Sequence, residues 1–300
     1  MKCNSHFLSY VCLLFLCCSC QAPQNQPKVL SLDDSRLLAW CIVPFDSEER
    51  SPAERIQMLE ELGFSQYAYD WRQRHLSSFT EEINLARQAE IEIAAVWMYI
   101  SSQDEQPGML SPDNTRLLNI MREQELKTQL WLGFPDQYFE GLDEEAKVGK
   151  ATAMIRYLLE EAGSVISRVG LYNHGGWFGN PVNQLKILEA IDDERVGIVY
   201  NFHHAHEQIA TFPSLLDQMQ PHLLAVNLNG MQKGGPKILT IGKGNAESSM
   251  LRTLLASGYD GPIGILGHVE DEDVQIVLER NLHGLDSLLQ HLDTASVNSN

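Results

Sequence analysis

From Leu37 onwards, the chain repeats one pattern: a short apolar run, a polar turn, and a segment whose apolar residues recur at helical spacing. Short apolar runs that alternate with helical segments are typical of parallel strands joined by helices. The eight apolar runs cover residues 37–45, 66–71, 91–100, 128–134, 170–172, 197–200, 223–230 and 262–269. Eight strands and eight helical segments over about 260 residues match the count and length of a (β/α)8 barrel.

We therefore expect an α/β fold, a single (β/α)8 TIM-barrel domain over residues 37–293, with a disordered tail over 294–300. The alternative is an open doubly wound sheet, which needs a Gly-rich phosphate turn after an early strand. The loops that follow Phe45 and Trp71 carry no glycine, so the sequence favours the barrel.

Residues that favour helix starts support this division of the chain. Ser51-Pro52 and Asn180-Pro181 each open a helix with proline at the first helical position. Thr80 is expected as the N-cap of the helix that follows the second strand.

The first 20 residues are typical of a targeting segment and not of a fold. Lys2 supplies a small positive region, and Phe7–Cys18 is an uncharged apolar run of about 12 residues, too short to span a membrane. Ser19-Cys20 at the end of this run resembles a bacterial lipoprotein cleavage site, and an ordinary cleaved signal peptide is the alternative. We expect residues 21–36 to be a flexible tether, and the protein to be exported, periplasmic or anchored to a membrane only through a lipid on Cys20.

Cysteine usage fits an exported chain without disulfides. Five of the six cysteines lie in the leader, which leaves only Cys41 in the body of the chain. A domain of this size buries enough core to fold without such bridges. Cys41 lies within an apolar run, so we expect it to be a small buried hydrophobe.

The charge of the chain limits its partners. Forty acidic residues against 22 basic ones give a formal net charge of −18. Such a surface repels a phosphate backbone, so the sequence argues against a nucleic-acid partner. A small carbohydrate is compatible with it.

Aromatic side chains gather at the ends of the expected strands, where barrel enzymes place their active sites. Trp71, Trp97, Trp131 and Trp177, four of the five tryptophans, fall in this set. Aromatic faces beside hydrogen-bonding side chains form a common sugar-binding surface. For Trp97 and Trp131, which lie within strands, a place in the barrel core is an equal alternative.

A cluster of histidines near the ends of three expected strands is the most informative local pattern in the sequence. His203, His204 and His206 follow one strand, and His174 and His268 follow two others. Histidine titrates near neutrality and binds metals, so the cluster indicates acid–base catalysis or metal ligation. A solvated loop is the alternative. Strand alternation predicts that Tyr172 with His174, Asn227 with Asn229, and Leu266 with His268 face a common pocket.

Three further charged residues are candidates. Asp70 and Arg72 could form a catalytic acid–base pair or a structural ion pair. Lys243, within the segment Gly-Lys-Gly, could close over an anionic group, although a surface turn is the alternative.

Several motifs together resemble the sugar phosphate isomerase/epimerase-like, xylose isomerase-like TIM barrels. They are LYNHGG, YNFHHAH, VNLNG, IGKG and GYDGPIGILGH, in chain order from strand five to strand eight. The resemblance implies a divalent metal held by Glu, Asp, His and Glu at the ends of these strands, and proton transfer on a keto- or hydroxy-sugar. At the four ligand positions this chain carries Tyr172, Asn201, Asn227 and Leu266.

Loss of the four usual ligands leaves two possibilities for a cofactor. Either the site works without metal, or His174, His268 and one of His204 and His206 supply three imidazoles for Zn²⁺ or a similar divalent ion. Asparagine oxygens are weak ligands for a catalytic divalent ion, and leucine supplies none.

The sequence thus predicts an exported enzyme for isomerisation or epimerisation beside the carbonyl of a sugar or sugar derivative, or for a hydratase or lyase variant of that chemistry. The alternative is a non-catalytic carbohydrate-binding lipoprotein on a degenerate barrel. The expected catalytic residues are His174, His204, His268 and Asp70. The expected substrate-binding residues are Arg72, Trp97, Trp131, Asn173, Trp177, Asn201, His203, His206, Asn227, Asn229 and Lys243.

Overall fold

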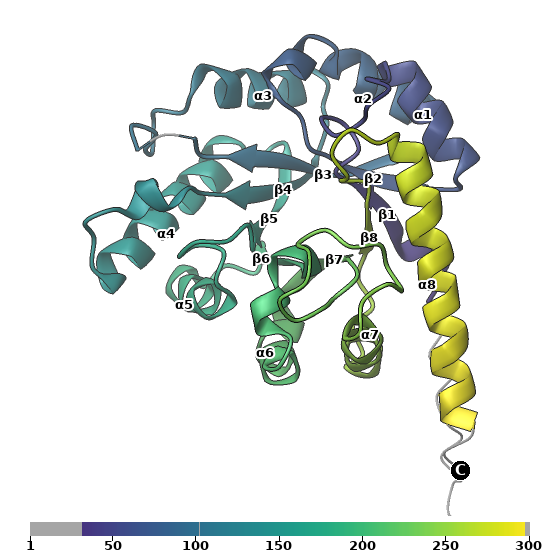
Figure 1. The fold of residues 1–300 in the computed structure, drawn as a ribbon. Coiled ribbons are helices and arrows are strands. Elements are labelled where there is room, and N and C mark those ends of the chain that lie inside the picture. The colour runs from purple at the N-terminus through teal and green to yellow at the C-terminus, as the bar shows by residue number, and fades with distance from the viewer. Residues whose placement is uncertain (1–31, 102, 298–300) are drawn as a thin grey trace, which may run out of the picture.

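The computed structural model describes residues 32–101 and 103–297. Within them, eight parallel strands pair in chain order and close into a barrel, because β8 pairs with β1 (Figure 1). The strands are β1 Leu37–Trp40, β2 Gln66–Tyr69, β3 Glu92–Tyr99, β4 Thr128–Gly133, β5 Ile166–Tyr172, β6 Val196–Asn201, β7 Leu223–Leu228 and β8 Ile263–Leu266. The predicted (β/α)8 barrel is confirmed.

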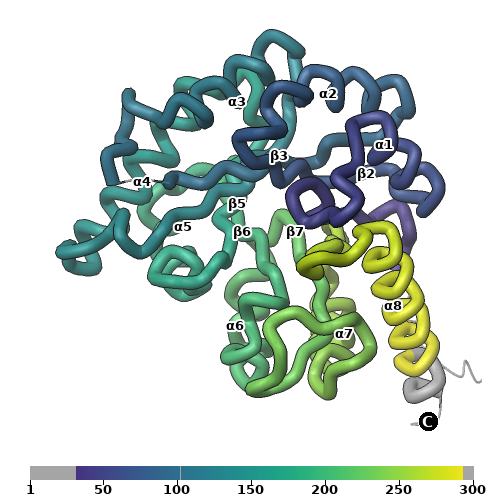
Figure 2. The backbone as a smooth tube through the Cα atoms, turned by 45° about the horizontal axis from the view of Figure 1, so that its top comes forward, coloured from purple at the N-terminus to yellow at the C-terminus, as the bar shows by residue number. Residues whose placement is uncertain are grey.

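A helix follows each strand and packs on the outside of the barrel, as the backbone trace shows (Figure 2). The helices are α1 Pro52–Glu61, α2 Phe79–Gln88, α3 Pro112–Glu123, α4 Glu144–Glu161, α5 Pro181–Ile191, α6 Phe212–Met219, α7 Glu247–Ala256 and α8 Val274–Val297. Among the described residues, no helix has the length and apolar character needed to cross a membrane.

Most helix starts follow the local sequence. Ser51 caps α1 in a reciprocal capping box with Glu54, and the side chain of Asn180 accepts a hydrogen bond from the Val182 amide at the start of α5. The expected N-cap at Thr80 is wrong, because α2 begins at Phe79. The Phe79 ring is fully buried and stacks on Tyr69 with 4.4 Å between ring centroids, which anchors the first turn of the helix to β2.

Both ends of the barrel domain differ from the expected boundaries. Asp34–Arg36, the end of the expected tether, is a short 3-10 helix, and the Arg36 guanidinium donates hydrogen bonds to the main-chain oxygens of Tyr259 and Gly261. This segment is therefore part of the barrel. Helix α8 runs to Val297, into the segment expected to be a tail. The signal segment over residues 1–20 lies outside the described residues, so its type stays a prediction.

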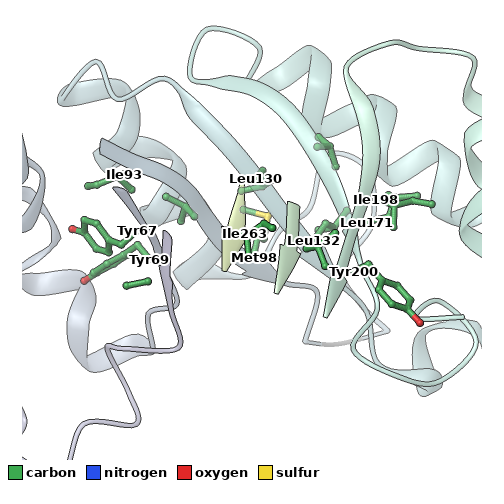
Figure 3. Close-up of a cluster of buried hydrophobic side chains, with 14 of the residues drawn as sticks. Tyr67, Tyr69, Ile93, Met98, Leu130, Leu132, Leu171, Ile198, Tyr200 and Ile263 are labelled. Carbon is green, nitrogen blue, oxygen red and sulfur yellow. The ribbon is translucent and has the colours of Figure 1, made fainter. Parts of the chain in front are cut away.

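Side chains alternate along the strands between two hydrophobic layers. One layer lies between the strands and the helices and includes Leu130, Leu132, Leu171 and Ile198 (Figure 3). The other fills the interior of the barrel. There Trp131 is 1% exposed and packs edge-on against Trp40 with 4.9 Å between ring centroids, so this tryptophan belongs to the core and not to a sugar-binding surface.

A buried ion pair ties the first two helices to β2. Arg55 Nη1 of α1 lies 2.6 Å from Glu82 Oε2 of α2, and the Tyr67 hydroxyl of β2 donates to Glu82 Oε1 over 2.8 Å. The Arg55 and Glu82 side chains are almost inaccessible to solvent. The carboxylate is therefore compensated by a cation and a neutral donor, as a buried charge requires.

Candidate active site

Two adjoining cavities lie at the carboxyl ends of the strands, the end at which TIM barrels place their chemistry. The smaller one, the inner cavity, has a volume of about 90 Å³ and is lined by His174, His203, His204, His268 and Asp70 among others. The larger one, the outer cavity, has a volume of about 420 Å³. Arg72, Trp97 and His174 line both cavities, so the two form one continuous site.

Four imidazole rings from three strand ends meet in the inner cavity. The ring centroids of His203 and His204 are 3.7 Å apart, and those of His174 and His204 are 4.7 Å apart. His268 lies 6.1 Å from His203 and stacks on Phe45 at 3.5 Å. The structure thus brings together the three histidines expected to be catalytic, together with His203.

Burial keeps these imidazoles uncharged. It lowers the pKa of His174 to about 4, although that ring opens to solvent at the mouth, and the positive charges of Lys237 and Arg72 lower it further. Burial is also the largest cause that lowers the pKa values of His203, His204 and His268. Near neutral pH the four rings are therefore proton acceptors and not cations.

One of these rings has a free acceptor, and another has a buried nitrogen without a partner among the residues that the structure describes. The side-chain oxygen of Asn201 accepts from His203 Nδ1 over 3.0 Å, because an amide oxygen can only accept, and this leaves His203 Nε2 without the proton. His204 Nε2 is buried and has no hydrogen-bond partner in the described residues. A buried ring nitrogen without a partner is costly unless a ligand satisfies it, so His204 is the strongest candidate for contact with a substrate.

Asp70 and Cys41 face these histidines from the opposite side, since β1 and β2 lie across the closed barrel from β5 and β6. Asp70 Oδ1 accepts from the Val43 amide over 3.2 Å, and Oδ2 has no partner among the described residues. Burial raises the Asp70 pKa to about 6. Burial also raises the pKa of the Cys41 thiol, which stays protonated.

Two cationic side chains complete the inner cavity. The guanidinium of Arg72 lies 5.4 Å from the centre of the Phe45 ring and donates to the main-chain oxygens of Asp70 and Trp71, each over 2.9 Å. Arg72 therefore contacts Asp70 through the backbone. The second cation is Lys237, which the sequence analysis did not single out.

The expected asparagines form the frame of the site and do not line it. The Asn173 side chain donates to the main-chain oxygen of Asn201 over 3.0 Å and accepts from its main-chain amide over 2.7 Å, and so joins the end of β5 to β6. Asn201 Nδ2 also donates to the Tyr172 hydroxyl. Asn227 is fully buried and packs under Gly264, where a β-carbon would collide with its side-chain oxygen. Asn201 thus holds the His203 ring through its side-chain oxygen, and none of the three asparagines lines either cavity.

His206 and Asn229 hold a loop in place. The two ring nitrogens of His206 lie 3.0 and 2.9 Å from the main-chain oxygens of Gln232 and Lys237. Asn229 bonds to the main chain of Gly230, Lys237 and Leu239. Both residues were expected to contact a ligand, but their polar atoms are engaged by the loop that carries Lys237 into the cavity.

Trp177 and Lys243 lie outside the two cavities. The indole of Trp177 donates to Glu144 over 3.0 Å and packs on Phe139, at a separate surface depression. Lys243 is exposed on the loop before α7, where its amide closes a turn onto Thr240. The surface-turn alternative therefore describes Lys243, and Lys237 supplies the cation instead.

The residues at the four usual ligand positions do not fit the divalent metal that the resemblance implies. The Tyr172 hydroxyl accepts from Trp40 Nε1 over 2.8 Å and from Asn201, and the Asn201 oxygen faces His203. Leu266 has no donor atom. In the part of the chain that the structure describes, no three His, Cys, Asp or Glu side chains come together in a group that could hold a metal ion.

The closed barrel, with a polar cavity at the carboxyl ends of its strands, is the fold of the xylose isomerase-like TIM barrels, and the predicted resemblance is confirmed at the level of the fold. The chain is similar to 3-keto-D-glucoside 4-epimerase from E. coli, with a TM-score of 0.60 and 14% identity over 84% of this chain and 98% of that one. It is also similar to a D-tagatose 3-epimerase-like protein, with a TM-score of 0.60 and 16% identity over 87% of this chain and 99% of that one.

A third similar structure is a probable 3-DHS dehydratase from Bacillus anthracis, with a TM-score of 0.63 and 12% identity over 84% of this chain and 98% of that one. No protein-family model and no curated protein matches the sequence. The similarity is thus one of fold, and the chemistry has to be inferred from the side chains of this chain.

Cys41, Phe45 and Lys237 are cavity residues that the sequence analysis missed. The first two follow β1, which was expected to continue to Phe45 but ends at Trp40, because Cys41 has a left-handed backbone with φ of 59°. A residue directly after a barrel strand would have been a candidate by position alone. Lys237 has no local sequence signal, since it reaches the cavity only through the fold of its loop.

Proposed function

We propose that this protein is an enzyme that transfers a proton beside the carbonyl of a keto-sugar or a related sugar derivative, leading to epimerisation, isomerisation or loss of water. One observation carries the proposal: uncharged imidazoles face the Asp70 carboxyl across a cavity of about 90 Å³. Titratable groups on two sides of a small cavity suit removal of a proton at one face of a carbon and its return at the other.

The proposed first step is removal of a proton. A neutral imidazole, with His204 as the first candidate, takes the proton from the carbon next to the carbonyl. The C–H electron pair then forms a carbon–carbon double bond, and the carbonyl oxygen gains the negative charge. The cations Arg72 and Lys237 line the same cavity and stabilise this enolate oxygen.

The second step decides the product. Return of a proton from the Asp70 carboxyl to the opposite face of the same carbon gives an epimer. Return of the proton to the neighbouring carbon, with transfer of a second proton from one oxygen to the other, gives an isomer. If the hydroxyl group on the next carbon instead takes the proton from the Asp70 carboxyl and leaves as water, the enolate collapses to the unsaturated product of a dehydratase.

We propose that these steps need no divalent metal, because Tyr172, Asn201, Asn227 and Leu266 occupy the positions of the usual ligands. Arg72 and Lys237 take the place of the metal and stabilise the negative charge of the enolate oxygen. Two of the proteins with a similar fold are described as sugar epimerases or as epimerase-like, and one as a probable dehydratase, and these are the outcomes that this proton transfer allows.

The proposal is tested by deuterium exchange. The purified protein is mixed with a panel of keto-sugars in D2O, with and without a chelator, and the C–H signals beside the carbonyl are followed by NMR. We expect loss of one C–H signal at the same rate in both samples. Saturable sugar binding without exchange would instead support the alternative, a non-catalytic carbohydrate-binding protein.

We also propose that the protein is exported and anchored by a lipid on Cys20. The apolar run Phe7–Cys18 and the small residue Ser19 before Cys20 support this proposal. Expression in a bacterium fed a labelled fatty acid should label the wild type and not Cys20→Ser. Label in neither protein, with cleavage of the leader, would indicate an ordinary signal peptide.

A further inference from the structure

The outer cavity has more room than the proposed reaction needs. Sites for small molecules usually have volumes of about 300–1,000 Å³. The inner cavity, at about 90 Å³, is far below this range and admits only the reacting edge of a sugar. The outer cavity, at about 420 Å³, lies within it. Whatever enters the inner cavity must therefore extend past Arg72 and Trp97 into the outer one, since these residues line both.

The outer cavity is built from flat aromatic surfaces. Trp97 and Tyr99 of β3 stack with 5.9 Å between ring centroids and an interplanar angle of 20°. Trp71 is held beside them, because its indole nitrogen donates to the Trp97 main-chain oxygen over 2.6 Å. All three line the cavity, so the aromatic wall continues outward from the inner site. Such a wall suits the C–H face of a sugar ring.

Polar side chains face this wall. Gln73 follows β2, and Ser111, Asp113 and Asn114 lie at the start of α3. Gln73 Nε2 donates to Asp113 Oδ1 over 3.3 Å, so the pair offers both a donor and an acceptor at one edge of the cavity. Hydroxyl groups of a sugar can bond to both.

The charges favour a neutral ligand over a phosphate. The carboxylate of Asp113 lines the outer cavity together with the cation Arg72, so the two charges offset each other and the outer cavity has no excess of positive charge for a phosphate. The chain as a whole carries a formal charge of −18, which also repels anions. A sugar phosphate is therefore a poor match for this cavity.

We infer that the substrate is a glycoside and not a free monosaccharide or a sugar phosphate. The sugar ring that reacts enters the inner cavity, and a second ring attached to it, a further sugar in the simplest case, lies on Tyr99 and Trp71 in the outer cavity. This inference rests on the proposed function and names the class of its substrate.

The first test measures binding and does not depend on turnover. Tryptophan fluorescence, which Trp71 and Trp97 should report, is titrated with glucose, methyl glucoside and cellobiose. We expect cellobiose to bind at least about tenfold more tightly than glucose, the factor given by a modest number of added contacts. Equal affinity for the two would overturn the inference.

The second test compares turnover. Exchange in D2O is measured on 3-keto-glucose, its methyl glycoside and 3-keto-cellobiose, for the wild type, Gln73→Ala and Tyr99→Ala. The ratio of kcat/KM for the disaccharide to that for the monosaccharide should fall about tenfold in both variants. Gln57→Ala, on the exposed face of α1, serves as the matched control and should keep the wild-type ratio.

The proposed reaction and the proposed second-ring site can be disproved separately. If no sugar exchanges but cellobiose binds more tightly than glucose, the proposed reaction is wrong and the second-ring site stands. If exchange occurs with equal kcat/KM on all three keto-sugars, the reaction stands and the second-ring site is wrong.

Discussion

The indole nitrogen of Trp40 donates a hydrogen bond to the hydroxyl of Tyr172 over 2.8 Å, and so joins β1 to β5 through the interior of the barrel. Asn201 of β6 donates to the same oxygen. Three strands thus meet at one phenol, at the position where the resemblance implies a glutamate that binds metal. At this point of the barrel the side chain therefore links strands through hydrogen bonds.

Removal of that phenol should destabilise the barrel. Tyr172→Phe leaves the Trp40 and Asn201 donors buried without an acceptor, at a cost of about 1–3 kcal/mol for each unsatisfied group. Urea unfolding measures the change. Tyr157→Phe, on α4, is the control and should change the free energy of unfolding by less than about 0.5 kcal/mol. Equal stability of the two variants would show that the phenol has no such role.

Loss of the unpaired imidazole should remove the reaction with little effect on the fold. His204→Asn is expected to lower the exchange rate by about 10²–10⁴-fold, the usual contribution of a positioned acid or base. NMR exchange in D2O measures it. His222→Asn, directly before β7 and thus at the far end of the barrel, is the matched control and should keep the wild-type rate. A fully active His204→Asn would exclude this ring as the base.

Stability should decline in mild acid. The folded barrel lowers the pKa of His174 to about 4, and also lowers the pKa values of His203, His204 and His268. Between the ordinary pKa of about 6.5 and these lowered values, the unfolded chain binds more protons than the folded one, so the free energy of unfolding falls as the pH falls. Asp70 opposes this trend, because its pKa is raised to about 6 and the folded state gains one proton there.

The urea midpoint should therefore be lower at about pH 5 than at about pH 7. The dependence should weaken in His203→Asn, which removes one of the buried rings. A midpoint that rises towards acid in the wild type would mean that these rings are protonated in the folded protein.

The ion pair between α1 and α2 gives a prediction away from the site. Arg55→Met leaves Glu82 buried without its cation, which costs about 3–5 kcal/mol. The second substitution Glu82→Gln should restore part of the lost free energy of unfolding, because a neutral amide needs no cation. The control is Arg122→Met, which breaks an exposed pair with Glu161 and should cost about 1 kcal/mol or less. Urea unfolding of the wild type, the two single variants and the double variant measures these changes. A loss in Arg55→Met no larger than that in Arg122→Met would contradict the prediction.

The order of strands and helices could be predicted because each is encoded locally. The apolar runs and the caps at Ser51 and Asn180 lie within a few residues of the elements they define. The strand ends were less accurate, since they depend on single backbone angles such as the φ of 59° at Cys41. Burial of Phe79 against Tyr69, a contact across the fold, moved the start of α2 away from Thr80.

Which residues line the cavities could be predicted only in part, because a position near a strand end does not fix where the side chain points: Asn173 follows β5 directly and lines neither cavity. His174, His204 and Asp70 reach the inner cavity, as the barrel rule requires. The alternation of side chains along a strand predicted that Asn229 would point inwards with Asn227. However, β7 ends at Leu228, and side chains do not alternate in this way beyond the end of a strand. Lys237 could not be predicted, because its place depends on how a loop folds back.

The bonds made by the Tyr172 hydroxyl also limit which substitutions this position accepts. A single substitution to glutamate at this position would supply one ligand of the metal centre that the resemblance implies, but it would remove the ring that packs against Trp40, Trp97 and Trp131. Asn201, Asn227 and Leu266 would have to change as well before a metal gained enough donors. A variant with only some of these substitutions would lose stability without gaining affinity for a metal. One substitution therefore cannot introduce a metal centre here without loss of packing in the barrel interior, and an engineered metal site would have to begin by redesigning that interior.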